Sequence, residues 1–217
     1  MIIWFATGNV HKKAELAAIL PEHTVKIPAD AGLPFDPEET GAAFVDNALI
    51  KARALYRLVR ETARGDGAPQ AVIADDSGLC VDALGGRPGI YSSRYGGAGS
   101  GAAPGTGKKP GARERNALLL AELGNNPDRG ARFVCAMVLL LDENRFRAVQ
   151  ETLEGTIVRS PGEAQGAGGF GYDPILYLPE RGCTVAELPE EEKNRISHRG
   201  KAARIVAGML ETSPLLW

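Results

Sequence analysis

The amino-acid sequence predicts an α/β protein with a mixed β-sheet flanked by helices. Apolar segments of strand length alternate with helical patterns over the first half of the chain. Two long apolar segments then follow one another across residues 142–144, which indicates a hairpin. The chain of 217 residues is 44% hydrophobic and 24% charged, which suffices for a sizeable core. It contains no repeat and no linker between independent domains, so residues 1–217 are treated as a single domain.

The first half of the chain predicts three strands and two helices. Apolar residues at helical spacing mark each helix, and Pro21 ends the first one. The second helix is long and amphipathic, opens at Thr40-Gly41, and ends at residues 65–67. The third strand should place Asp75 and Asp76 at its C-terminal end, before a tight turn at residues 77–78. We expect strands at 2–6, 24–27 and 71–74, and helices at 10–20 and from 40 to about 64.

The second half begins with a segment of distinct composition. Residues 97–111 are rich in Gly, Ala, Pro and Ser, which predicts a mobile loop. Another loop is expected at 161–169, where proline and glycines accumulate. We expect helices at 113–123 and 197–210, and strands at 132–141, 146–158 and 175–178.

Charge and cysteine usage narrow the class of protein. A formal net charge of −2 argues against a general nucleic-acid binder, whose domain would usually be basic. Cys80, Cys135 and Cys183 are widely spaced without a CxxC motif, so neither a zinc site nor a disulfide framework is indicated. Free thiols suit a reducing cytoplasm. The apolar N-terminus is too short for a signal peptide, and no apolar run would span a bilayer. We therefore expect a cytoplasmic protein without membrane contact.

Thr7-Gly8-Asn9 joins the first strand to the first helix, a geometry that suits phosphate binding. The first-turn amides of a helix lack intrahelical acceptors, and the helix dipole favours an anion there. Lys12 lies one turn into the helix and can reach back as a point charge. The alternative is a helix cap followed by a solvated lysine pair, Lys12-Lys13.

The long second helix carries polar side chains on one face. Asn47 and Lys51 are four residues apart and so share a face, where Lys51 could bind a phosphate. The alternative is a surface lysine. Glu38 and Glu39 precede this helix, where acidic residues favour the N-terminus, so helix capping competes with metal binding for both.

Asp75-Asp76 is difficult to explain as structure alone. Adjacent carboxylates at the end of a buried strand cost desolvation and repel each other, whereas a divalent cation removes both penalties. Mg²⁺ prefers a few carboxylates together with waters and substrate phosphates. Because successive strand residues point to opposite faces, one carboxylate could bind metal or activate water while the other anchors the loop. The residues alone leave the choice between them open.

Two later segments could recognise a nucleobase. Residues 166–171 contain a formal GxGxxG, but prolines flank it and it opens no helix, so it is not a dinucleotide fingerprint. Phe170 among glycines could instead be a ring for a base to stack on, or a buried ring in a turn. Lys193 with residues 197–199 supplies donors that suit a 6-keto purine, which presents acceptors. The alternative is a capped helix with a solvated Arg199.

Together these segments resemble the inosine triphosphate pyrophosphatase family, also called the non-canonical purine nucleoside triphosphatases. The match follows the family's order over nearly the whole chain. It covers Thr7-Gly8-Asn9-Val10-His11-Lys12, Glu38 to Gly41, Phe44, Asn47, Lys51, Ala74 to Gly78, Gly85 to Ser92, Arg94-Tyr95, Gly169 to Pro174, Lys193 and Ser197 to Gly200.

The resemblance implies Mg²⁺-dependent hydrolysis of ITP, dITP and XTP to the monophosphate and pyrophosphate. It also implies an elongated two-lobed fold with a central nucleotide cleft, and a homodimer. By motif position, Asp76 is the expected catalytic base and a metal contact, and Glu38 is a second metal contact. The expected phosphate contacts are Thr7, Gly8, Asn9, Val10, His11, Lys12 and Lys51. The other expected substrate contacts are Ser77, Phe170, Gly171, Tyr172, Asp173, Lys193, His198 and Arg199. Of these, Lys193, His198 and Arg199 are expected to recognise the 6-keto base.

Two other function classes fit parts of the sequence. A nucleotide-binding sensor would keep the pocket without turnover, but binding alone needs no paired metal carboxylates. A different phosphohydrolase would release orthophosphate or cut canonical nucleotides, and the identity of the product separates it from the first hypothesis. The chain departs from the family at residues 97–111, where a shorter and more polar connection is expected.

Overall fold

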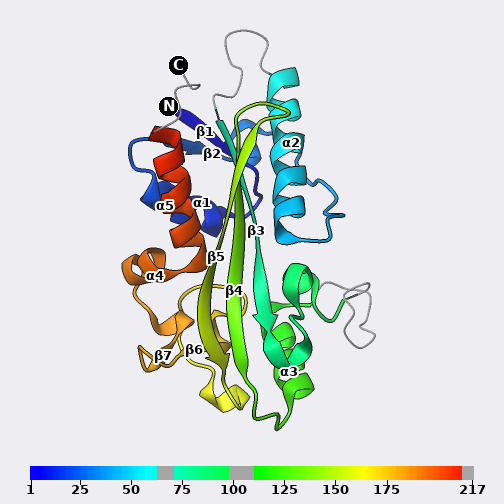
Figure 1. Cartoon of the computed structure of the whole chain (residues 1–217), viewed down its shortest axis with the longest axis vertical. Coiled ribbons are helices and arrows are strands. Elements are labelled where there is room, and N and C mark those ends of the chain that lie inside the picture. The colour runs from blue at the N-terminus through cyan, green and yellow to red at the C-terminus, as the bar shows by residue number, and fades with distance from the viewer. Residues whose placement is uncertain (63–70, 98–109, 212–217) are drawn as a thin grey trace. The chain divides into compact units, whose positions relative to one another are not determined.

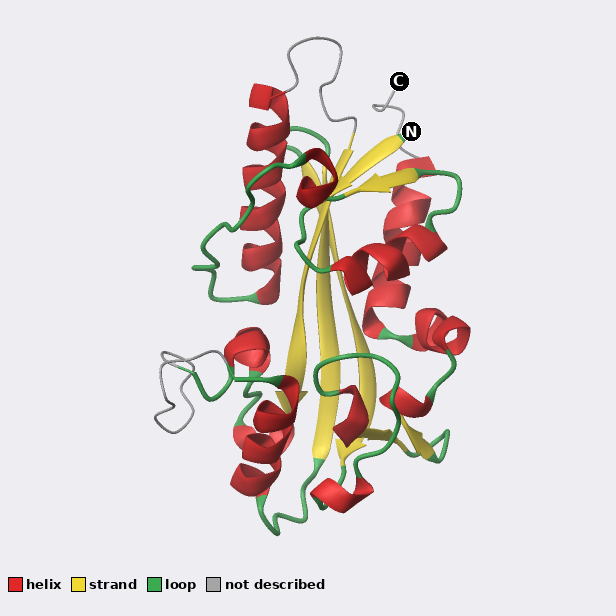
Figure 2. Ribbon diagram, turned by 180° about the vertical axis from the view of Figure 1, so that it is seen from behind, coloured by secondary structure: helices red, strands yellow, loops and turns green. Residues whose placement is uncertain are grey.

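A computed structural model describes residues 1–62, 71–97 and 110–211. Its strands form one seven-stranded sheet in the order β2-β1-β3-β4-β5-β6-β7 (Figures 1 and 2). β1 pairs in parallel with β2 and β3, whereas β6 pairs antiparallel with β5 and β7. The predicted mixed α/β sheet is therefore confirmed. The strands are β1 (Ile2–Phe5), β2 (Thr24–Lys26), β3 (Ala71–Val81), β4 (Gly130–Leu140), β5 (Phe146–Ile157), β6 (Leu176–Leu178) and β7 (Cys183–Thr184).

Five α-helices accompany the strands in the described part of the chain. They are α1 (Val10–Ile19), α2 (Phe44–Thr62), α3 (Ala112–Leu123), α4 (Glu190–Ile196) and α5 (His198–Glu211). None of these helices is both long enough and apolar enough to cross a bilayer.

The chain divides into two compact units. Among the described residues, the first comprises 1–62, 71–76, 135–151 and 198–211, and the second comprises 77–97, 110–134 and 152–197. β3, β4 and β5 contribute residues to both units.

In the first unit, helices cover both faces of the strands. α1 packs against α5 on one face, and α2 lies on the other (Figure 1). Side chains alternate along the strands accordingly. In β3, Ile73 joins the cluster under α1 and α5, whereas its neighbours Val72 and Ala74 join the cluster under α2. Burial on both faces explains why β3 reads as a continuous apolar run before its first carboxylate.

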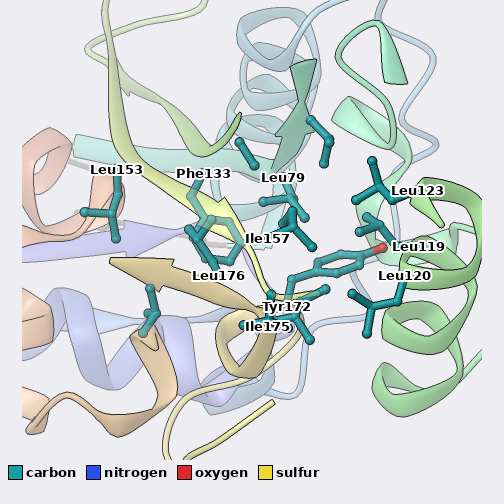
Figure 3. Packing of buried hydrophobic residues seen from close by; sticks show 14 of the residues in the cluster. Leu79, Leu119, Leu120, Leu123, Phe133, Leu153, Ile157, Tyr172, Ile175 and Leu176 are labelled. Carbon is teal, nitrogen blue, oxygen red and sulfur yellow. The ribbon is translucent and has the colours of Figure 1, made fainter. Parts of the chain in front are cut away.

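The second unit has its own apolar core. Leucines of α3 pack with Tyr172 and with residues of β3, β4, β5 and β6 (Figure 3). Tyr95 belongs to the same cluster and is fully buried. This core fixes the segment that contains Phe170, because Tyr172 and Ile175 are anchored in it.

Several predicted boundaries were wrong, and the contacts show why. β3 continues to Val81, so Asp75 and Asp76 lie within a strand and residues 77–78 extend it instead of turning. Burial of Leu79 and Val81 in the second core favours the continued strand. α2 begins at Phe44, because the Asn47 side chain accepts the Gly41 N–H at 2.8 Å and holds that glycine outside the helix.

The sequence did not predict two short elements, β7 and α4. β7 spans only Cys183–Thr184 and shows no alternation, and α4 is a mostly charged seven-residue helix. Two predictions fall on residues outside the described ranges. These are the end of the long helix at 65–67 and most of the loop at 97–111.

Candidate active site

Asp75 is held on several sides within the first unit. Its Oδ1 accepts the Lys12 ammonium at 3.0 Å, and its Oδ2 accepts Nε of Arg199 at 3.0 Å. The Cys135 sulfur lies 3.9 Å from the same Oδ2. Arg199 in turn donates from Nη1 to Glu15 at 2.6 Å. Asp75 is therefore an ionised anchor that joins β3 to α1 and α5.

Asp76 has a different set of partners. Its Oδ2 accepts the Asn47 amide at 3.1 Å, and its Oδ1 lies 3.5 Å from the Lys51 ammonium. Lys51 also contacts Glu39 Oε1 at 2.5 Å. Asn47 and Lys51 both come from α2, as their four-residue spacing predicts. The alternation of β3 thus directs the two adjacent carboxylates to different helices.

The two environments shift the pKa values of Asp75 and Asp76 in opposite directions. Burial alone would raise the pKa of Asp75, but the cations of Lys12 and Arg199 outweigh it and hold that pKa well below its usual range. At Asp76 burial prevails over the attraction of Lys51, and the pKa is raised. Nearby Glu39 raises it further. Asp76 is therefore the better proton acceptor of the pair, because a carboxylate with a raised pKa binds a proton more readily.

The two lysines of this cluster also differ. Burial and the neighbouring cations Arg199 and Lys51 lower the pKa of Lys12 despite its contact with Asp75. For Lys51 burial is outweighed by Asp76, Asp75 and Glu39, so its pKa is raised. Each ammonium lies against a carboxylate here, Lys12 against Asp75 and Lys51 against Glu39 and Asp76.

The segment from Thr7 to Lys12 forms a capped helix start. Asn9 Oδ1 accepts the backbone amides of His11 at 2.9 Å and Lys12 at 3.4 Å, and Thr7 Oγ1 accepts the Asn9 amide at 3.1 Å. The capping alternative is therefore realised for Asn9. This cap does not use the amides of Gly8 and Val10, and both residues are exposed. The helix start keeps the geometry that suits an anion.

The acidic residues before α2 lie in different surroundings. Glu38 is exposed, whereas Glu39 is partly buried and paired with Lys51. Within residues 1–62, 71–97 and 110–211, no group of three or more His, Cys, Asp and Glu side chains could hold a metal ion. The carboxylates of Glu39 and Asp76 nevertheless converge on one ammonium group, which makes them the two closest acidic neighbours of that lysine.

In the second unit, residues Gly169–Asp173 form a tight turn, named here the Phe170 turn. Asp173 Oδ2 accepts the Phe170 N–H at 2.8 Å and the Lys193 ammonium at 3.0 Å. The same ammonium lies 5.0 Å from the centre of the Phe170 ring. Gly169 has φ of +72°, and a Cβ there would lie 2.0 Å from Asp173 Oδ2, so only glycine fits. The turn thus presents a half-buried ring beside one buried cation.

The remaining predicted residues divide between the units. Tyr172 is 4% exposed, and its hydroxyl donates to the Ser92 carbonyl at 2.9 Å. Ser77 lies in the second unit and is half-buried. His198 and Arg199 lie in the first unit at the start of α5, and both are buried. Arg199 is only 2% exposed, so its ion pairs give it a structural task that the sequence did not predict.

Glu15 is the member of the carboxylate cluster that sequence reasoning missed. It is 8% exposed although charged, and it follows Lys12 by three residues on α1, which places the two on one face. A carboxylate beside Leu16 on the buried face of a helix is the signal that could have found it. Burial of such a group requires a cation, and Arg199 supplies it.

Comparisons with known proteins identify the family of this chain. Residues 3–208 match the Ham1 family. The chain is 50% identical over 213 residues to a dITP/XTP pyrophosphatase of Treponema denticola, covering 98% of this chain and all of the relative. It is 43% identical to a dITP/XTP pyrophosphatase of Geobacillus kaustophilus, covering 92% of this chain and 89% of the relative. A solved HAM1 protein from Coxiella burnetii shares 36% identity with a TM-score of 0.80, covering 98% of this chain and all of that one.

Proposed function

Because the chain belongs to the Ham1 family, we propose that it hydrolyses ITP, dITP and XTP to the nucleoside monophosphate and pyrophosphate. Its relatives from Treponema denticola and Geobacillus kaustophilus are named for dITP and XTP. The observation that carries the proposal is the contrast within the carboxylate pair. Asp75 is neutralised by two cations, whereas Asp76 has a raised pKa and lies beside Lys51.

In the proposed reaction a water attacks the α-phosphorus in line with the departing pyrophosphate. An oxygen–phosphorus bond forms, the bond from the α-phosphorus to the bridging oxygen breaks, and Asp76 accepts a proton from the water. The ammonium groups of Lys12 and Lys51 stabilise the charge that accumulates on pyrophosphate. The residues need no covalent nucleophile for this displacement.

The donor set suits Mg²⁺, which takes one or two carboxylates and completes its octahedron with waters and substrate phosphates. Asp76 would hold the ion with one acidic residue of the segment before α2. Glu38 is the partner that the sequence motif suggests, whereas Glu39 is the one that shares the Lys51 ammonium with Asp76. When bound, such an ion neutralises phosphate charge and orients the attacking water.

We assign the triphosphate to residues of the first unit, and the nucleoside to residues of the second unit together with His198 and Arg199. In the first unit, Thr7, Gly8, Asn9, Val10, His11, Lys12 and Lys51 take the triphosphate. Ser77, the Phe170 turn and Lys193 of the second unit take the nucleoside, with Phe170 stacking on the base. Donors from Lys193, His198 and Arg199 suit the 6-keto group, because an exocyclic amine at that position would face another donor. Arg199 would donate to the 6-keto group while its Nε and Nη1 stay hydrogen-bonded to Asp75 and Glu15.

The proposal includes the expected setting of the enzyme. The resemblance implies a homodimer, and the composition predicts a cytoplasmic protein that binds neither nucleic acid nor membrane. Cys80, Cys135 and Cys183 form no disulfide, in keeping with free thiols.

The deciding experiment measures pyrophosphate release from ITP, XTP, dITP, GTP and ATP, with Mg²⁺ and then with EDTA. We expect metal-dependent pyrophosphate from the first three and little from GTP or ATP. Orthophosphate as the product would indicate a different phosphohydrolase. Tight binding without turnover would indicate a nucleotide sensor. Glu38→Gln and Glu39→Gln, titrated with Mg²⁺, would show which acidic residue sets the metal requirement.

A further inference from the structure

Helix α3 contacts the Phe170 turn through a residue outside every motif considered above. Asn116 donates from Nδ2 to the Gly171 carbonyl at 3.2 Å. Asparagine is a poor residue for the middle of a helix, because its side chain competes for backbone hydrogen bonds. Its position in α3 therefore calls for an explanation in its contacts.

The contact fixes the orientation of the Asn116 amide. The Gly171 carbonyl can only accept a hydrogen bond, so the amide nitrogen and not the oxygen must face it. The Asn116 Oδ1 is buried and has no hydrogen-bond partner in the described part of the chain. Leaving a buried acceptor unsatisfied is costly. The hydrogen bond that Nδ2 donates to the turn offsets part of that cost.

The turn is fastened at different points by different groups. Asp173 holds the Phe170 amide and Lys193 on one side, as described above. Gly171 has φ of +69°, a state that glycine reaches readily, but the conformational freedom of glycine leaves this peptide in need of a restraint from elsewhere. Asn116 supplies it at the carbonyl of that same residue. The preceding Arg115 lies 5.9 Å from the centre of the Tyr172 ring.

Beside Asn116, the packing of α3 against this segment is incomplete. A pocket of about 430 Å³ is lined by Asn116, Ala117 and Leu120 of α3 and by Pro174 and Ile175 beyond the turn. Where side chains leave such a space, fewer apolar contacts restrain the backbone. The hydrogen bond from Asn116 therefore carries more of the positioning than it would in a filled core.

We propose that Asn116 is a positioning residue for base binding, which acts by fixing the Gly171 peptide and thereby the direction of the Phe170 ring. This inference rests on the proposed function, in which that ring stacks on the base. Asn116 touches neither the phosphates nor Asp76 in this assignment. Its loss should weaken binding of the nucleoside and leave the chemical step intact.

The test compares Asn116→Ala and the isosteric Asn116→Asp with wild type. We expect KM for ITP to rise about 3- to 10-fold in Asn116→Ala, the range expected for one neutral hydrogen bond, with kcat within about twofold. Asn116→Asp keeps the shape but removes the donor, so it should show at least the same rise. Asn125→Ala is the matched control, since Asn125 is an exposed asparagine just after the same helix.

Inhibition by inorganic tripolyphosphate separates positioning from general damage. This probe has no base, so its inhibition constant should equal that of wild type in both Asn116 variants. An unchanged KM for ITP would overturn the proposal, and so would a parallel rise of KM and the tripolyphosphate constant. Wild-type protein that releases no pyrophosphate from ITP would instead refute the proposed function, so the two failures are distinguishable.

Discussion

The carboxylate cluster of the first unit and the Phe170 turn of the second hold their polar groups by different means. The cluster is assembled from distant segments, since Asp75 meets Lys12 and Arg199 across 63 and 124 residues of sequence. The turn has a local hydrogen bond, since the Phe170 amide donates to Asp173 three residues later. Gly169 and Gly171 adopt the positive φ values that this turn requires. The difference teaches that the first region rests on ion pairs between distant segments, whereas the second combines a local hydrogen bond with support from Lys193 and Asn116.

The largest expected effect comes from removing the proposed base. Asp76→Asn should lower kcat by about 10³-fold or more, within the range of general-base contributions. The free energy of unfolding should change little, because burial already disfavours the charged form of this carboxyl. Pyrophosphate release and urea unfolding measure the two effects. Near-normal turnover of Asp76→Asn would show that Asp76 is not the general base.

The neighbouring substitution should act on stability instead. Asp75→Asn leaves the buried cations Lys12 and Arg199 without their shared counter-charge, which we expect to cost about 3–5 kcal/mol of unfolding free energy. Urea unfolding beside Asp76→Asn gives a matched pair of isosteric changes. Equal stability of the two variants would contradict the separate tasks assigned to these carboxylates.

Within the Phe170 turn, Lys193→Ala should lower kcat/KM for ITP by roughly 10- to 100-fold, the range for a charged hydrogen bond. Lys193 is 8% exposed and contacts both Asp173 and the Phe170 ring. Arg195→Ala on the same helix is the control, because the Arg195 side chain is 65% exposed. A similar loss in both variants would point to damage of α4 and not to base binding.

The smallest effect concerns pH. The base must be deprotonated, so kcat/KM should fall as pH falls through the raised pKa of Asp76. Asn47 donates to the ionised carboxylate and so lowers this pKa. Asn47→Ala should therefore move the acidic limb of the pH–rate profile to higher pH. A limb that stays in place or moves to lower pH would show that another group controls it.

Sequence patterns predicted the secondary structure better than the contacts between distant side chains. Apolar periodicity located most helices and strands, because burial on one face imposes the period. It could not show that β3 continues past Asp76, since residues 75–77 are polar and the burial of Leu79 and Val81 depends on a second core. The ion pair of Glu15 with Arg199 joins residues 184 positions apart, a distance that no local pattern reports.

The same limit applies to Asn116 and the Phe170 turn. Proline and glycines predicted a loop at residues 161–169, and Phe170 was recognised as a ring that a base could stack on. The donor that supports Gly171 lies 55 residues earlier on a helix, where one asparagine gives no signal in a single sequence. Only the folded chain brings the two together.

The thiol of Cys135 gives the carboxylate cluster a native reporter. It is fully buried beside Asp75, and burial raises its pKa, so a thiol reagent can reach and ionise it only when the strands open locally. Cys80 and Cys183 are partly exposed and should be labelled first. The labelling rate of Cys135 would then report how often the surrounding strands open in the wild-type protein. We expect a bound nucleotide to lower the labelling rate of Cys135.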